Sequence, residues 1–75
     1  MSEKQHQTLK LLGNHIKNIR LNKGMTQIEV SAKMNRDQQS LQRVESGRVN
    51  PSFIYLLELS DALEIHIGEL VTFKQ

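Results

Sequence analysis

The side chains best suited to recognise another molecule lie between residues 38 and 43. Gln38 and Gln39 are followed about one helical turn later by Arg43. An amide places a donor beside an acceptor and a guanidinium offers two parallel donors, so each can bond two atoms of a base edge at once. Paired glutamines are also ordinary residues of a soluble helix surface. The segment therefore has the chemistry for reading DNA bases, and its context must decide between these two interpretations.

Catalytic chemistry has little support in the sequence. The three histidines, His6, His15 and His66, are scattered, and there is no cysteine. No Ser-His-acid set, metal-ligand spacing or glycine-rich phosphate loop is present. We therefore expect a protein that is not an enzyme and that needs neither a cofactor nor a metal.

Length and composition are those of one small domain. A chain of 75 residues with 37% apolar residues can form a single domain over residues 1–75, with a polar N-terminus, residues 1–6, that could be disordered. The N-terminus lacks the apolar stretch of a signal peptide, which predicts a cytoplasmic protein. The longest aliphatic or aromatic run, Phe53 to Leu57, is far shorter than the roughly 20 residues of a membrane-spanning helix.

Charge is distributed unevenly along the chain. Residues 1–25 contain five Lys and Arg against one Glu, whereas residues 51–75 contain one Lys against four Asp and Glu. The net charge of +2 therefore hides a basic first part and an acidic end. A polyanion such as double-stranded DNA would bind the basic part.

Three helices can be predicted around the glutamine segment. Apolar residues spaced three and four apart predict a helix over residues 7–22, which Gly24 ends. Thr26 and Glu29 form a capping box that starts a helix over residues 27–34. Asn35 tolerates left-handed backbone angles and can end that helix, and Asp37 then caps a third over residues 38–46. A tight turn thus joins two short helices.

Two more helices complete the expected all-α fold. Pro51 and Ser52 start a fourth helix. Its inward face should consist of Phe53, Leu56, Leu57, Leu59, Ala62 and Leu63. A short fifth helix should contain Ile65, Ile67, Leu70 and Val71. No strand alternation, repeat or linker interrupts the series, so we expect a compact five-helix domain.

Roughly residues 9–71 resemble the lambdoid repressor and Cro type of helix-turn-helix, the XRE family. The matching positions are Leu12-Gly13, Ile16, Ile19-Arg20, Lys23 to Gln27, Glu29-Val30, Met34, Leu41, Arg43 to Arg48, Asn50 to Ser52, Leu56, Ala62-Leu63 and Glu69-Leu70. Controller proteins of restriction-modification systems and many antitoxins share this pattern. The resemblance implies a lambda-repressor-like DNA-binding domain whose second and third helices form the motif.

The resemblance also implies roles for individual residues. Base edges would be read by Gln38, Gln39, Gln42 and Arg43, in a helix that lies in the major groove. Phosphates would be bound by Gln27, Ser40, Arg48 and Asn50. Gln27 can also be an ordinary first-turn residue, and Lys23, Lys33 and Arg36 are expected to be solvated charges that add general attraction.

Other residues are expected to be structural. By resemblance, Arg20 pairs with Glu45 and so orients the reading helix. His15 should face solvent, and His66 with Glu69 could cap the fifth helix. The chain departs from the family pattern at several places: Asn35 and Glu64 stand where glycine is usual, Arg36 where a small apolar residue or Thr is common, Ser31 and Ser60 where alanine packs, and His66 where Ser or Thr caps. Because a left-handed Glu64 would be strained, we expect the end of the fourth helix to differ.

Apolar residues near the C-terminal end suggest a protein partner. A homodimer interface would contain Ile54, Tyr55, Ile67, Val71 and Phe73, although Ile67 and Val71 could instead complete the core. A two-fold dimer would place two reading helices about 34 to 36 Å apart, one DNA turn. The expected function is a transcription regulator, such as a repressor, that binds a two-fold symmetric operator. The alternative is an antitoxin or interaction module of a toxin-antitoxin or restriction-modification system, whose main partner is a protein.

Overall fold

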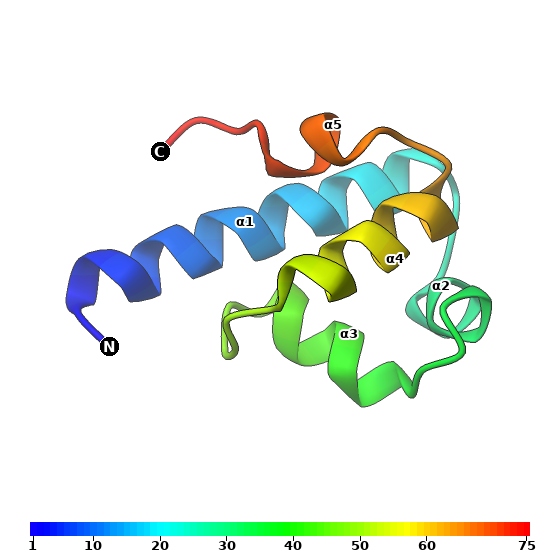
Figure 1. Ribbon diagram of the computed structural model, residues 1–75, viewed down its shortest axis with the longest axis horizontal. Coiled ribbons are helices and arrows are strands. Elements are labelled where there is room, and N and C mark those ends of the chain that lie inside the picture. Colours follow the sequence, from blue (N-terminus) through cyan, green and yellow to red (C-terminus); the bar gives the residue numbers. More distant parts are fainter.

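Five α-helices make up the computed structural model, which describes residues 1–75. They are α1 (Glu3–Asn22), α2 (Gln27–Lys33), α3 (Gln38–Glu45), α4 (Phe53–Leu63) and α5 (Ile67–Val71). Helix α1 runs the length of the molecule, with α5 on one side and α3 on the other (Figure 1). Helix α2 packs against α3 and α4, and both chain termini lie toward the same end (Figure 1). The predicted all-α, five-helix fold is confirmed.

Side-chain caps start the helices where the sequence indicates. Thr26 Oγ1 accepts from the Glu29 N–H at 3.1 Å, and Glu29 Oε1 accepts from the Thr26 N–H at 3.0 Å. The hydrogen bond from the Thr26 backbone lowers the pKa of Glu29. Asp37 Oδ1 accepts from the Ser40 N–H at 2.8 Å, and Ser52 Oγ accepts from the Tyr55 N–H at 3.0 Å. Each cap satisfies backbone donors that a helix start leaves free.

Helix α1 begins earlier than predicted. It starts at Glu3 rather than at residue 7, so most of the N-terminus that could have been disordered is helical. Ser2 Oγ accepts from the Gln5 N–H at 3.1 Å, and Gln5 Oε1 accepts from the Ser2 N–H at 2.9 Å. The sequence does not predict this capping box, because no apolar residue follows in that turn to indicate a helix. The exposed first turns extend beyond the other helices (Figure 1).

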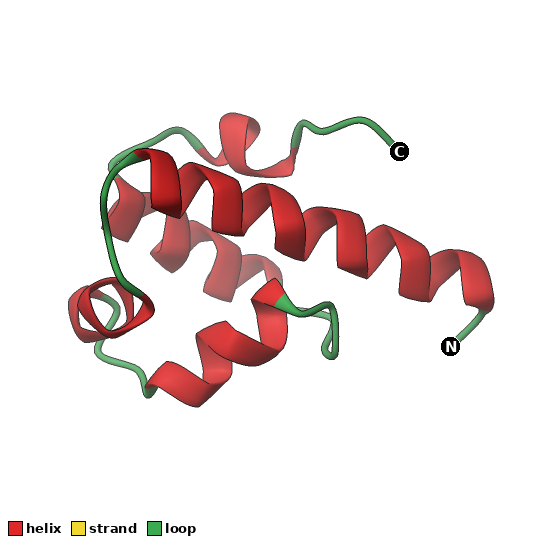
Figure 2. Ribbon diagram, turned by 180° about the vertical axis from the view of Figure 1, so that it is seen from behind, coloured by secondary structure: helices red, strands yellow, loops and turns green.

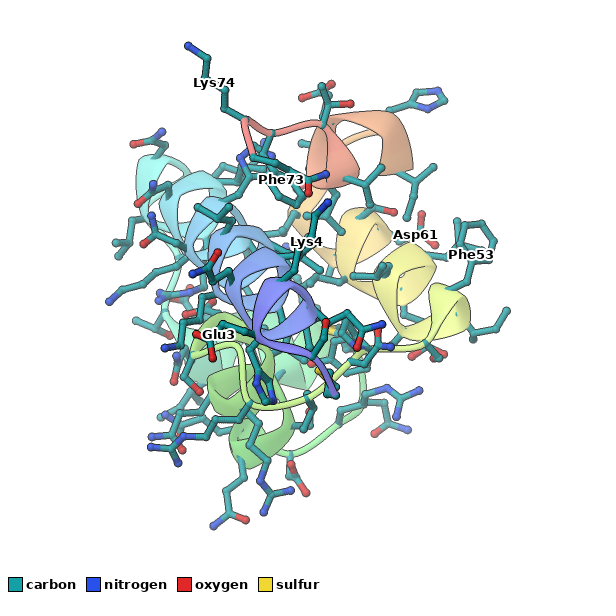
Figure 3. All side chains as sticks on the ribbon, turned by 90° about the vertical axis from the view of Figure 1, so that its left-hand side faces the viewer. Glu3, Lys4, Phe53, Asp61, Phe73 and Lys74 are labelled. Carbon is teal, nitrogen blue, oxygen red and sulfur yellow. The ribbon has the colours of Figure 1, made fainter.

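The predicted inward face of α4 needs correction at its start. Phe53 is 64% exposed and points away from the domain in Figure 3, whereas Tyr55 is only 7% exposed. The inward positions of α4 are Tyr55, Leu59, Ala62 and Leu63, spaced by helical turns, and Phe53 falls outside that stripe. Leu56 and Leu57 are half-buried. In the hydrophobic core, the four inward residues of α4 pack with residues of the other helices, namely Leu12, Ile16, Val30, Met34, Leu41, Val44 and Leu70.

Two residues other than glycine adopt left-handed backbone angles at helix ends. Asn35 ends α2 with φ 56°, as predicted. Glu64 ends α4 with φ 58°, so the expectation that this end would differ from the family pattern was wrong. The Ile65 N–H donates to the Ser60 carbonyl at 3.0 Å, which satisfies an end group of the helix and offsets the strain.

Predictions for two histidines also need correction. His66 precedes α5, but its side chain makes no capping hydrogen bond. His15 is half-buried rather than solvent-facing, because the C-terminal segment folds back over α1. His15 Nε2 lies 2.8 Å from the Glu69 carbonyl oxygen, and its ring lies 5.6 Å from that of Phe73. Figure 3 shows Phe73 directed toward α1.

No helix is both long enough and apolar enough to span a bilayer.

Candidate nucleic-acid interface

Helix α3 has one buried face and one exposed face. Leu41, Val44 and Glu45 face the interior. The four predicted readers are all exposed, namely Gln38, Gln39, Gln42 and Arg43. The helix lies at the edge of the molecule next to α2, with nothing covering its outer side (Figure 2). The structure therefore gathers two-point hydrogen-bonding groups on one accessible helix face.

A buried ion pair fixes the C-terminal end of α3. Arg20 Nε donates to Glu45 Oε2 at 2.7 Å, and Arg20 Nη2 donates to Glu45 Oε1 at 3.0 Å. The residues are 6% and 7% exposed. Arg20 Nη1 also donates to the Met25 carbonyl at 2.7 Å. One guanidinium thus joins the end of α1, the loop before α2 and the end of α3. The pairing of Arg20 with Glu45 that the resemblance implies is present.

Gln27 does not project freely toward a phosphate. Its Nε2 donates to Glu45 Oε1 at 2.9 Å, and its Oε1 accepts from Gln38 Nε2 at 3.3 Å. The residue is half-buried between the two helices of the motif. This role of Gln27 cannot be predicted from the sequence, because 18 and 11 residues separate it from its partners and no local pattern indicates such contacts. One amide hydrogen of Gln27 remains unused.

Ser40 and Tyr55 join α3 to α4. Ser40 Oγ donates to the Asp37 carbonyl at 3.0 Å and lies 3.3 Å from the Tyr55 hydroxyl oxygen. Burial raises the pKa of Tyr55, so this hydroxyl remains protonated at neutral pH. The assignment of Tyr55 to a dimer interface is corrected, because its side chain is buried within the monomer.

Arg36 is exposed, but it makes two specific contacts that the expectation of a solvated charge did not include. Its Nε donates to Glu58 Oε1 at 2.7 Å, and its guanidinium lies 5.1 Å from the centre of the Tyr55 ring. The hydrogen bond to Glu58 raises the pKa of Arg36. A shallow groove beside α3 is lined by Arg36, Ser40, Arg43, Pro51, Ser52 and Tyr55, among others. Basic side chains therefore extend along the side of the reading helix.

Arg48 and Asn50 lie in the loop after α3, where both are exposed. Gly47 starts this loop with φ 74°, and an added Cβ would lie 2.7 Å from Lys10 Cα. Only glycine combines that angle with so close an approach to α1. Figure 2 shows this loop leaving the end of α3. It places two polar side chains next to the reading helix.

The chain is similar to known DNA-binding regulators. The helix-turn-helix family model matches residues 16–70. An uncharacterised HTH-type transcriptional regulator of Sinorhizobium fredii, y4dJ, is 46% identical over 63 residues, which cover 84% of this chain and 82% of the relative.

Solved structures agree with this relationship. The restriction-modification controller protein C.AhdI from Aeromonas hydrophila superposes with a TM-score of 0.80 at 31% identity, covering 83% of this chain and 94% of that one. A tyrosine-to-phenylalanine variant of the controller C.Esp1396I superposes with a TM-score of 0.77 at 30% identity, covering 85% of each chain. The chain belongs to the helix-turn-helix family of the XRE type, a family of DNA-binding transcription regulators rather than enzymes.

Proposed function

We propose that this protein binds double-stranded DNA sequence-specifically, with α3 in the major groove. The observation that carries the proposal is the exposed set Gln38, Gln39, Gln42 and Arg43 on a helix whose end is held by the Arg20–Glu45 pair. Each two-point pair between such a side chain and its base discriminates by about 1 to 3 kcal/mol. A rigid support keeps these side chains at the distance that such pairs require.

Phosphate contacts would flank the reading helix. Arg48 and Asn50 extend from the following loop, and Gln27 keeps one amide hydrogen for a phosphate at the start of α2. Ser40 is a weaker candidate than its position in the sequence indicates, because its hydroxyl already bonds the Asp37 carbonyl. These contacts set the register of the protein on the duplex without reading sequence.

The protein would act as a homodimer on a two-fold symmetric operator. Ile54 and Val71 are 60% and 45% exposed, and Phe53 at 64% takes the place proposed for Tyr55. Ile67 and Phe73 are half-buried and would contribute only their accessible edges. Helix α5 and α3 lie on opposite sides of α1, so contacts through α4 and α5 leave the reading helix free (Figure 1). The occupant of this apolar surface would be a second copy of the chain.

Regulation would follow from occupancy of the operator in the cytoplasm, with repression as the simplest outcome. A second candidate is a controller of restriction-modification genes, since two solved structures that share 30% or more identity with this chain carry that name. Genes for a methylase and an endonuclease beside the coding sequence would favour that role over a stand-alone repressor.

Selection from a pool of random duplexes tests the proposal. Enrichment of a two-fold symmetric site, with half-sites about one helical turn apart, is the expected result. If no sequence is enriched at an ionic strength where the protein still binds DNA, the proposal of sequence-specific recognition is wrong. Enrichment of a single half-site without symmetry would reject the homodimer alone.

A further inference from the structure

The shallow groove between α3 and the start of α4, here called the α3–α4 groove, carries positive charge. Its lining residues are Arg36, Ser40, Arg43, Val44, Val49, Pro51, Ser52 and Tyr55. Two of them are arginines, and none is a carboxylate. Both arginines and Ser52 are exposed, whereas Val44 and Tyr55 are buried. The groove is therefore an open, basic surface directly beside the reading helix.

Two contacts hold the guanidinium of Arg36 at this groove. Its Nε donates to Glu58 Oε1 at 2.7 Å, and its plane lies 5.1 Å from the centre of the Tyr55 ring. A guanidinium carries five N–H donors, and the ion pair uses the one on Nε. The four N–H groups on the two terminal nitrogens make no hydrogen bond within the chain. Arg36 is thus held in place while most of its donors stay available.

The three hydroxyl groups of the groove are not equally available. Ser40 has one hydroxyl hydrogen, which it donates to the Asp37 carbonyl at 3.0 Å. The Tyr55 hydroxyl lies 3.3 Å from Ser40 Oγ and must therefore be the donor in that contact. Ser52 Oγ accepts from the Tyr55 N–H at 3.0 Å, so its own hydrogen remains unused. Only Ser52 can donate to a molecule in the groove without breaking an existing hydrogen bond.

A phosphate group fits these donors. A guanidinium binds phosphate through two parallel N–H groups, and a hydroxyl can donate to a further oxygen. With α3 in the major groove, the backbone phosphates lie along both edges of that groove, beside the helix. Arg43 lines the α3–α4 groove as well and adds a positive charge without being tied to a carboxylate. Chemistry and position therefore both favour a phosphate of the DNA backbone.

We propose that the α3–α4 groove binds one phosphate of the DNA backbone, with Arg36 as its main ligand and Ser52 as a second donor. Glu58 and Tyr55 are positioning residues that hold the guanidinium without touching DNA. The inference rests on the proposed function, because it adds a phosphate contact beside the same reading helix. It gives a binding role to Arg36, a position at which this chain departs from the family pattern.

The first test measures affinity for the selected operator over a range of salt concentrations. In Arg36→Gln, which removes the guanidinium, the slope of log affinity against log salt should fall by about one. Affinity at fixed salt should fall by about tenfold, and equally for the selected and a scrambled duplex. Lys33→Gln is the matched control, since Lys33 is also an exposed cation near a carboxylate, 3.9 Å from Glu64, but lies outside the groove. It should change the slope much less.

The second test locates the contact with neutral methylphosphonate groups, placed one at a time in the operator backbone. The wild type should lose affinity at a position where Arg36→Gln shows no further loss, whereas Lys33→Gln should keep the whole wild-type pattern. If Arg36→Gln also keeps that pattern, the groove binds no backbone phosphate and the inference is wrong. If the wild type selects no duplex at all, the proposed function itself fails. Thermal unfolding establishes that each variant is folded.

Titration with inorganic phosphate in the absence of DNA distinguishes the source of the phosphate. At constant ionic strength, we expect no saturable change in the NMR signal of the Ser52 amide. A saturable change that is lost in Arg36→Gln, together with an unchanged methylphosphonate pattern, would assign the groove to a free phosphate compound. That result would contradict the contact with DNA.

Discussion

The guanidinium of Arg20 makes three hydrogen bonds to two residues at the interface. It bonds Glu45 twice and the Met25 carbonyl once, away from solvent. Removing one member of a buried pair leaves the other charge poorly satisfied. The exposed pair of Arg36 with Glu58 has a similar 2.7 Å contact, but water screens it. The two arginines are therefore a matched comparison of buried and exposed ion pairs.

Arg20→Ala should lower the free energy of unfolding by about 3 to 5 kcal/mol. Urea unfolding followed by circular dichroism measures this loss, and DNA affinity should fall with it. Arg36→Ala is the control and should shift the urea midpoint much less. Equal shifts for the two variants would contradict a special contribution from the buried pair.

Ser31 offers the opposite experiment, a gain in stability. The residue is 2% exposed, and its Oγ has no hydrogen-bond partner. A buried hydroxyl without a partner costs about 1 to 3 kcal/mol, so Ser31→Ala should stabilise the domain by about 1 kcal/mol. Such a gain raises the melting temperature by about 4 to 8 °C in a domain of this size.

Ser60→Ala is the control for this experiment. Ser60 is 3% exposed, but its Oγ donates to the Leu57 carbonyl at 2.8 Å. Its replacement should therefore give no comparable increase in melting temperature. A lower melting temperature for Ser31→Ala would show that its hydroxyl is satisfied after all.

Between elements, α1 lies close to the end of α3 at Gly13. A Cβ added at Gly13 would clash with the carbonyl oxygens of Val44 and Glu45, whereas one added at Gly68 in α5 would meet nothing within 4 Å. Gly13→Ala should therefore destabilise the domain by about 1 to 3 kcal/mol and displace α3. Gly68→Ala should be neutral or stabilising by up to about 1 kcal/mol. Thermal unfolding of both variants measures the difference, and a neutral Gly13→Ala would contradict the tight contact.

Most helix boundaries can be predicted from local sequence signals. The others depend on contacts between residues that are distant in the sequence. Thr26, Asp37 and Asn35 act within one or two turns of their own positions, so their roles could be recognised in the sequence. The start of α1 was missed because Ser2 and Gln5 precede a turn without apolar residues. The phase of α4 could not be predicted, because Phe53 and Tyr55 are both aromatic and lie two residues apart, and only the packing of the neighbouring helices decides which of them is buried.

The candidate site also follows from the sequence only where local spacing determines it. Exposure of the readers on α3 follows from the inward spacing of Leu41 and Val44. The contacts of Gln27 with Glu45 and of Arg36 with Glu58 join residues 18 and 22 positions apart. Nothing in the local sequence specifies them, because they depend on how the helices pack.

On the scale of the whole molecule, assembly is open to a direct test. Ile54→Glu places a charge on the proposed dimer surface, where burial without a partner is costly. Sedimentation should show its mass falling toward the 8.6 kDa of the monomer while the wild type stays dimeric. Ile28→Glu is the control, since Ile28 is 64% exposed on α2, compared with 60% for Ile54 on α4. If both variants have the same mass, the proposal that the surface around Ile54 forms the dimer interface is wrong.

The most direct measurement of the central claim is the ratio of affinities for the selected operator and a scrambled duplex. The variant in which Gln38, Gln39 and Arg43 are replaced by Ala is compared with one in which Gln7, Asn18 and Lys17 on α1 are replaced by Ala. Each removes one positive charge and two exposed amides. Fluorescence anisotropy at fixed salt should show that the α3 variant loses operator preference but keeps salt-sensitive general binding, whereas the α1 variant keeps the preference. Retained preference in the α3 variant would contradict sequence reading by this helix.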